Sequence, residues 1–298
     1  MKNAEKTFDY KLIRDELSEV LNFVENKIER EWVEKYKYLD SGKETLLPYL
    51  RIAKNTFKTI LFICSDIKDN STREEYFALA VSPLTRTLLE ILFSVVYLLE
   101  NFPEKIKLFD KSYYKEQKGA TDWFRQKYSG IKKWDKYLSE KNSKLNMYEE
   151  MLLENNLLTE NEKNNLDQIR YFPRVSKIIS RLEDENSDAV TFLKYLDDLH
   201  YRELSGQSHL EPSGIVEFYP FFLNLQFNKN IADEIAFYKS KQVYLATSFI
   251  LSLISEIVID FNYELKSKLA YIWVLLSSGS ELSEEIYQMR YQKLLAEQ

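Results

Sequence analysis

Both histidines of the chain lie in one short stretch, from Leu199 to His209, and this stretch is the best place to look for chemistry. It also contains Arg202, and six residues lie between Arg202 and His209. Histidine can pass a proton near neutral pH, and arginine can hold a phosphate through two parallel hydrogen bonds. Together they are a minimal set for cleaving RNA without a metal. His209 would move the proton of the 2′-hydroxyl or of the leaving group, while Arg202 would stabilise the charge that builds on the phosphorane.

The spacing of this pair sets a geometric condition. On an unbroken helix a step of seven residues returns to nearly the same face, about 10.5 Å further along the axis. That is too far for both side chains to grip one phosphate oxygen. A bend at Gly206 would shorten the distance, as would pairing with the same motif of a second protomer. Tyr201 and Ser205 are four residues apart and are candidate hydroxyl donors to the same pocket.

The same residues have purely structural interpretations. His209 could buttress the loop before Pro212 through a hydrogen bond to a backbone carbonyl or to Glu90. Arg202 could form an ion pair with Asp198, four residues before it. Asp197, Asp198 and His200 superficially suggest metal ligands. Residues packed so closely on a helix point in different directions, which favours a solvated face.

A second polar group interrupts the most apolar part of the chain. Arg86 and Glu90 are four residues apart, in the company of Ser82, Thr85 and Ser94. They could form an ordinary ion pair within a helix, which stabilises by a few tenths of a kcal/mol. In so apolar a helix the polar strip is expected to be partly buried, and buried charges need partners. The alternative is therefore an internal polar site, in which Arg86 and Glu90 would support the histidine.

These motifs resemble two families. Arg202-x6-His209, at the end of a predicted helix, resembles the Arg-x(4 to 6)-His motif of the HEPN superfamily. Its members include metal-independent ribonucleases of toxin and abortive-infection systems, which typically act as dimers with a composite site. Arg86-x3-Glu90, taken with Tyr201-Arg202-x2-Ser205-x3-His209, is similar to a family of bacterial helical proteins of unknown function. The resemblance covers residues 71–102 and 194–214.

Other catalytic signatures are missing from the sequence. It has no Gly-rich phosphate loop, no Cys pair for zinc, no His-Glu-x-x-His and no Gly-x-Ser-x-Gly. Since there are two histidines and one cysteine, a His/Cys metal site is not expected. The sequence therefore predicts neither a metal nor another cofactor.

The segment 102–145 is predicted to be a basic, aromatic insertion or lid. From Asn101 to Leu145 there are 12 Lys and Arg against 6 Asp and Glu, a local charge of +6, so the remainder carries −12. Basic groups beside exposed aromatic rings can follow a phosphate backbone and stack bases. The candidate nucleic-acid-binding residues are Trp123, Arg125, Lys132 and Lys133. The favoured alternative is a pair of short helices, joined at Gly119 and Gly130, whose aromatic rings face the core.

The composition predicts the architecture that must position these residues. Of 298 residues only six are Gly and six are Pro, so most of the chain must lie in long elements without tight hairpins. We therefore expect a single all-α domain over 1–298, a bundle of roughly eight to ten helices with a long central apolar helix and a long C-terminal helix. The helical periodicity predicts helices at about 8–39, 44–66, 73–100, 188–206, 231–276 and 281–295.

Several observations indicate a soluble, cytoplasmic protein. Cys64 is the only cysteine and lies in an apolar helical pattern. The N-terminal residues carry no apolar h-region of a signal peptide. The two apolar runs, 76–99 and 243–255, meet charged residues or are too short to span a bilayer. The net charge of −6 argues against a protein that coats nucleic acid or a membrane as a whole.

The function expected from these features is a HEPN-like, metal-independent ribonuclease of a bacterial stress or phage-defence system. It would be a toxin or abortive-infection protein that binds RNA and acts as a homodimer, with an operon-encoded protein as a further candidate partner. The alternative is a non-catalytic binding or adaptor protein whose polar pocket holds a nucleotide or a partner peptide.

Overall fold

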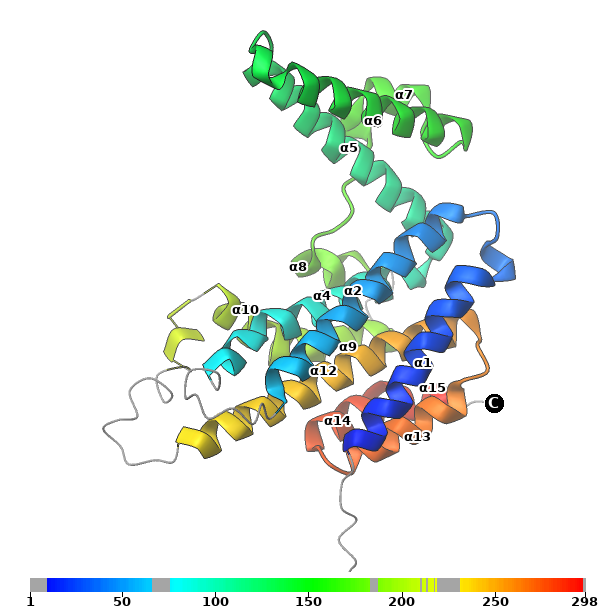
Figure 1. Cartoon of the computed structure of the whole chain (residues 1–298). Helices are drawn as coiled ribbons and strands as arrows, with labels where there is room; N and C mark the ends of the chain where they lie inside the picture. The colour runs from blue at the N-terminus through cyan, green and yellow to red at the C-terminus, as the bar shows by residue number, and fades with distance from the viewer. Residues whose placement is uncertain are drawn as a thin grey trace, which may run out of the picture.

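The chain folds into a helical bundle from which a helical arm projects (Figure 1). The computed structural model describes residues 10–65, 76–182, 187–209, 211–212, 214–216, 218 and 231–296. Within these residues every regular element is a helix, so the all-α prediction is confirmed. The bundle contains α1 (Tyr10–Arg30), α2 (Asp40–Cys64), α4 (Ser82–Glu100), α9 (Asp188–Leu196), α10 (Arg202–Ser208), α12 (Ile231–Phe261), α13 (Lys266–Ser277), α14 (Glu281–Ile286) and α15 (Gln292–Ala296).

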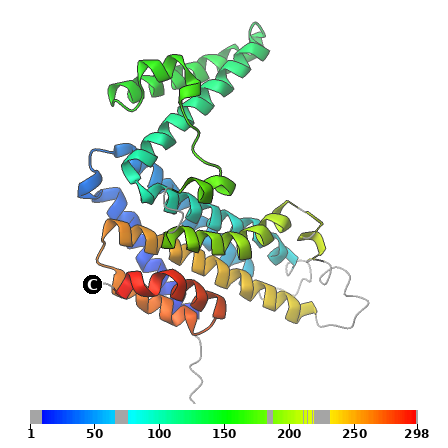
Figure 2. The same cartoon turned by 180° about the vertical axis from the view of Figure 1, so that it is seen from behind.

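Helix α4 lies at the centre of this bundle. It packs against α2, α12 and α10, and Figure 2 shows the bundle from behind, with α12 in yellow. Nearly every apolar side chain of its second half is buried, from Leu88 to Leu98. A helix that is apolar almost all round must be covered on all sides, which is why the other helices gather around α4.

The start of α4 differs from the prediction of one helix over 73–100. A 3₁₀ helix, η2 (Tyr76–Val81), comes first, and Pro83 stands at the beginning of α4. In the first turn the missing N–H of proline costs nothing, because those groups have no helical partner in any case. Residues 66–75, where the predicted helix begins, lie outside the described part of the chain.

The predicted helix 231–276 is two helices. Asn262 has a left-handed backbone with a φ of 54°, and the Tyr263 N–H donates to the Val258 carbonyl. Asparagine tolerates this conformation well, and the bond is the one that closes a helix C-terminus in a Schellman motif. The first predicted helix likewise ends earlier, at Arg30 rather than at 39.

Two helices have the length and composition to cross a membrane, Leu79–Glu100 and Asp233–Phe261. Of their most apolar windows, 67% and 83% is buried inside the fold. This burial agrees with their interpretation as core helices of a soluble protein.

The arm consists of α5 (Phe102–Tyr128), α6 (Asp135–Glu154), α7 (Glu160–Asn164) and the short 3₁₀ helices η3 (Lys132–Trp134) and η4 (Leu166–Gln168). It has a small core of its own, made of Tyr114, Leu145, Leu152, Leu158 and Ile169. The predicted boundary at 145 falls inside α6. Gly119 lies within α5 and not at a joint, whereas Gly130, with a φ of 79°, forms the turn at the tip. Gly119 does not interrupt α5, because the residues on both sides of it continue the helix.

The chain returns from the arm to the bundle through α8 (Val175–Ile178). The ring of Phe172 is anchored between Tyr97 of α4 and Phe109 of α5, with centroids 5.3 and 5.2 Å away. Helix α8 packs on α4, as α10 does.

Candidate functional site

The stretch with both histidines is one continuous helix that crosses α4. Between α9 and α10 it forms a π-helical turn, η6 (Asp197–Tyr201). Such turns are rare and often occur at functional sites. The helix does not end or bend at Gly206 as predicted, but continues to Ser208. His209 is its C-cap, and its N–H donates to the Ser205 carbonyl at 3.0 Å.

Buried contacts fix α10 against α4. The Ser82 hydroxyl donates to the side chain of Gln207, and it also contacts the hydroxyl of Tyr238 at 2.6 Å. Leu204 is fully buried on the same face. These contacts set the register that brings Tyr201 and His209 beside the polar strip of α4.

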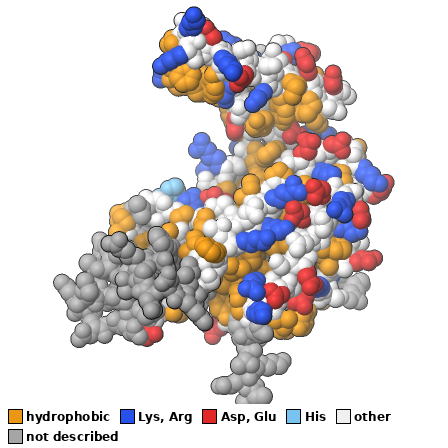
Figure 3. All heavy atoms as spheres, viewed as in Figure 1, with side chains coloured by type: hydrophobic (Ala, Val, Ile, Leu, Met, Phe, Trp, Pro, Cys, Tyr) orange, Lys and Arg blue, Asp and Glu red, His pale blue; other side chains and the backbone are white. Residues whose placement is uncertain are grey.

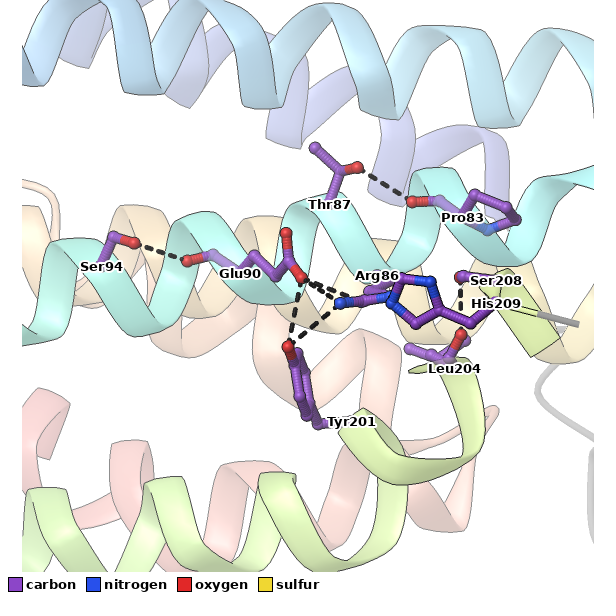
Figure 4. Close-up of polar contacts among 9 residues, drawn as sticks. All are labelled: Pro83, Arg86, Thr87, Glu90, Ser94, Tyr201, Leu204, Ser208 and His209. Atoms are coloured by element: carbon purple, nitrogen blue, oxygen red, sulfur yellow. Dashed lines mark hydrogen bonds and ion pairs between the residues drawn. The ribbon is translucent and has the colours of Figure 1, made fainter. Parts of the chain in front are cut away.

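Arg86 is the centre of the resulting cluster (Figure 4). Its Nε donates to Glu90 Oε1 at 2.9 Å, and its Nη2 donates to the Tyr201 hydroxyl at 3.2 Å. Its Nη1 lies 2.7 Å from His209 Nε2. The Tyr201 hydroxyl in turn donates to Glu90 at 3.3 Å, and the guanidinium lies 5.2 Å from the centre of the tyrosine ring. Two segments more than 110 residues apart in the sequence are thereby joined.

The contact between Arg86 and His209 assigns a protonation form to the imidazole. A guanidinium has only donors, so His209 Nε2 must be the acceptor. The ring is then neutral, with its proton on Nδ1, and this tautomer is inferred from the hydrogen bonding. A neutral imidazole is the form that can take up a proton on Nε2 once another acceptor replaces it on the Arg86 N–H.

The cluster is held from inside but open to the outside. The side chain of Arg86 is 15% exposed and that of Glu90 is 33% exposed, whereas His209 is exposed. Glu90, Tyr201 and His209 take three hydrogen bonds from Arg86, and Nη2 also lies 2.9 Å from Glu90 Oε1 in the ion pair. One N–H of Nη1 remains without a partner among the described residues, next to the imidazole. An anion could bind there.

Arg202 lies elsewhere. Its guanidinium pairs with Asp198 at 2.9 Å and with Asp197 at 3.9 Å, and its side chain is 71% exposed. Because the helix runs straight through Gly206, the separation along the axis is not shortened. In addition, a helical side chain leans toward the N-terminus, which carries Arg202 away from His209. The structure therefore does not bring the predicted Arg202/His209 pair together within one chain.

Of the other predicted supporting residues, Tyr201 belongs to the cluster and the Ser205 hydroxyl does not. Tyr201 points at the cluster, and burial raises the pKa of its phenol, so that it keeps its proton as a donor. Ser205 contributes its backbone carbonyl to the cap of His209, whereas its hydroxyl makes no hydrogen bond to a described residue. Arg86 and Glu90 were predicted as supporting residues. Arg86 contacts His209 directly, and Glu90 holds Arg86.

The loop after His209 is fixed by two glycines. A Cβ atom at Gly214 would lie 2.3 Å from the backbone carbon and oxygen of Gly206. The Glu211 N–H also donates to the Gly206 carbonyl at 3.0 Å. This close backbone contact returns the chain toward α10 directly behind His209.

The residues predicted to bind nucleic acid lie around the tip of the arm. Arg125 pairs with Asp122 at 2.9 Å and donates to Asn142 at 2.6 Å. Trp123 is 50% exposed, with the ammonium of Lys127 4.8 Å from its ring centre. The two exposed lysines of η3, Lys132 and Lys133, are at the end of the arm. Their role in binding nucleic acid stays a prediction.

A second group of cations, which sequence reasoning missed, lies much nearer to the site. Residues 169–182 contain Arg170, Arg174, Lys177 and Arg181 and no acidic residue. All four are exposed, and none forms an ion pair with a described residue. Three of them line a hollow of about 670 Å³ with Lys115 and the 56% exposed Tyr171. The sequence already indicated this group, because all charged residues from 169 to 182 are basic.

Figure 3 shows where this hollow lies. The surface is deeply indented between the arm and the bundle, and Lys and Arg side chains stand on the bundle side of the indentation. The same α8 that carries the cations packs on α4, which carries Arg86. The basic surface and the Arg86 cluster therefore both lie against the same helix, α4.

The described residues contain no group of three or more His, Cys, Asp or Glu side chains able to hold a metal ion. No protein-family model matches the chain, and no curated protein or solved structure is significantly similar to it. The chemistry of the site therefore has to be argued from its own geometry.

His200, the second histidine, has no role in this cluster. It is 7% exposed, lies between the rings of Tyr195 and Phe249, and has a buried Nε2 without a hydrogen-bond partner among the described residues. Burial lowers the pKa of His200 to about 4. It is a neutral core residue.

This burial predicts a pH dependence of stability. The unfolded chain takes up a proton on His200 near pH 6.5, whereas the folded chain resists until about pH 4. The contribution of His200 is therefore full above pH 6.5 and is lost as the pH falls toward 4, by about 3 kcal/mol. Urea unfolding of the wild type and of His200→Leu between about pH 4 and 6.5 measures this contribution. The effects of the other titrating groups cancel in the difference between the two proteins. Parallel pH profiles of the two proteins would contradict the assignment.

Proposed function

We propose that the protein is a metal-independent ribonuclease in which His209 is the general acid/base and Arg86 binds the scissile phosphate. The observation that carries the proposal is the 2.7 Å contact between Arg86 Nη1 and His209 Nε2 at an exposed position. It places a base and a phosphate ligand side by side with no acidic side chain between them. Relative to the HEPN-like motif of the sequence, Arg86 takes the role that was expected of Arg202.

The chemistry follows from the groups present. When the phosphate accepts the Nη1 hydrogen bond of Arg86 in place of His209, Nε2 is released and takes the proton of a ribose 2′-hydroxyl, whose oxygen attacks the adjacent phosphorus. The bond from phosphorus to the 5′-oxygen breaks, and this oxygen takes a proton from solvent. The products are a 2′,3′-cyclic phosphate and a 5′-hydroxyl end. Arg86 stabilises the extra negative charge of the phosphorane.

Glu90 has a positioning role in this scheme. Its carboxylate accepts from Nε of Arg86 and from the Tyr201 hydroxyl. The guanidinium plane is therefore fixed before a substrate binds. A preorganised donor is worth more than a mobile one, because no reorganisation is needed when charge develops.

The cations around α8 suit the backbone of a single-stranded RNA. Phe172 beside α8 contacts Tyr97, which lies eleven residues, or about 16 Å, along α4 from Arg86. A strand bound in the Arg86 cluster would reach this surface within a few nucleotides. Exposed Tyr171, with the Lys115 ammonium 4.4 Å from its ring centre, offers a face on which a base can stack.

The cellular setting is part of the same proposal. A ribonuclease with no cofactor requirement fits a cytoplasmic toxin or abortive-infection protein of a bacterial stress or phage-defence system. A homodimer would place two Arg86/His209 clusters on one particle. An operon-encoded partner protein would be expected to control such an activity.

Cleavage of RNA by purified variants tests the catalytic assignment. His209→Gln and Arg86→Met should each lower the cleavage rate by about 100-fold or more, since each removes one of the two groups that act on the phosphate. Arg202→Gln is the matched control, because it removes a surface guanidinium outside the cluster, and it should stay near the wild-type rate. EDTA should have no effect.

Two outcomes would contradict this assignment. One is full activity of either cluster variant with a native circular dichroism spectrum. The other is a complete lack of cleavage by the wild type as monomer and as dimer, which would favour the non-catalytic adaptor that the sequence left as the alternative.

The α8 surface makes a separate prediction about substrate binding. Combining Arg174→Gln, Lys177→Gln and Arg181→Gln should raise the KM for RNA by about tenfold at unchanged kcat. The slope of log Kd against log salt should fall by about 2, as expected for three lost phosphate contacts with a single strand. The control combines Lys37→Gln, Lys58→Gln and Lys293→Gln, which removes the same charge elsewhere. If the two triple variants had equal effects, the net charge of the protein, and not the position of the cations around α8, would explain RNA binding.

A further inference from the structure

A cavity of about 400 Å³ lies where the arm leaves the bundle, among α2, α5 and α6. Four aromatic rings line it, those of Tyr49, Phe109, Tyr113 and Tyr148. Tyr113 and Tyr148 meet edge to face at 5.2 Å, and Tyr49 and Phe109 at 6.4 Å. The volume is in the range of small-molecule sites, about 300 to 1,000 Å³.

The polar groups of this cavity are acidic. Asp110 and Glu44 line it, whereas none of its lining residues is a lysine or an arginine. Asp110 is 5% exposed. Its Oδ1 accepts from the Tyr148 hydroxyl at 3.3 Å, but its buried Oδ2 has no hydrogen-bond partner among the described residues. A buried carboxylate oxygen without a donor is costly, because the fold offers nothing in place of the water it has lost.

The electrostatics around Asp110 point the same way. The pKa of its carboxyl is raised to about 6, chiefly by burial, while the hydroxyls of Ser41 and Tyr148 lower it and the negative charge of Glu44 adds a smaller increase. At about pH 7.5 the group is therefore still ionised in most molecules. The cavity holds a buried negative charge for which none of the described residues supplies a positive partner.

We infer that this cavity is a binding site for a small organic ammonium ion. Four aromatic rings line the cavity, and aromatic rings attract the ammonium group of such ligands. Asp110 Oδ2 supplies the buried counter-charge, and exposed Glu44 adds a second one at the entrance. The ligand would also join α5 of the arm to α2 of the bundle. This inference does not depend on the ribonuclease proposal.

Choline is the probe for a test, because its neutral isostere 3,3-dimethyl-1-butanol has the same shape without the charge. Isothermal titration of the full chain at about pH 7.5 should show choline binding about tenfold or more tightly than the alcohol. Asp110→Asn keeps the shape of the side chain and should abolish this preference. Glu116→Gln, on the exposed side of α5 and outside this cavity, is the matched control and should keep it.

A second variant protects the test against misfolding. Tyr113 is 46% exposed, so that Tyr113→Leu should fold, and it should weaken choline binding while the alcohol is little affected. Equal affinities for the two probes, no binding of either, or an unchanged preference in Asp110→Asn would each overturn the inference.

Discussion

Burial of α4 is the constraint on which the rest of the structure depends. Its side chains are apolar on almost every face, so that α2, α10 and α12 must all pack against it. A helix in that position has little room for charge. Arg86 and Glu90 are tolerated because they lie at the edge of the covered surface and are paired with each other and with Tyr201. The polar cluster is thus the place where the central helix reaches the surface.

The same constraint explains why His209 meets Arg86. The register of α10 on α4 is set by buried groups, the contact of Gln207 with Ser82 and the burial of Leu204. Once these are in place, the C-cap of α10 lies over the polar strip of α4. Arg202 lies nearly two turns before His209 on the same helix, where a local ion pair with Asp198 satisfies it at no cost in packing. One arginine is therefore held by tertiary structure and the other by its own helix.

The two charged surfaces of the molecule divide by sign. The cations beside α8 face the indentation that neighbours the Arg86 cluster, whereas the carboxylates of Glu44 and Asp110 face a cavity at the root of the arm. An anionic polymer and a small cation would therefore use different faces of the same arm. Since α5 borders both, a ligand in the acidic cavity would contact the helix that also supplies Lys115 to the basic hollow.

The sequence was sufficient for the fold class and for most helices, because both depend on periodicity and on the scarcity of Gly and Pro. It failed where one backbone residue decides, as at Asn262, whose left-handed conformation ends α12 inside an apolar run. For the site, it identified Arg86, Glu90, Tyr201 and His209 as polar residues in unusual places. It could not pair them correctly, since the partner of His209 lies 123 residues away and depends on the register of α10 against α4.

The most direct test of the central claim is the tautomer of His209, read from ¹⁵N NMR of the imidazole nitrogens at about pH 8. His200→Leu leaves a single histidine signal and so assigns it. The account predicts that the proton is on Nδ1 in the wild type and that Arg86→Met moves the population toward the Nε2-protonated form. A wild-type His209 protonated on Nε2, or a spectrum that Arg86→Met leaves unchanged, would show that the guanidinium does not hold the imidazole.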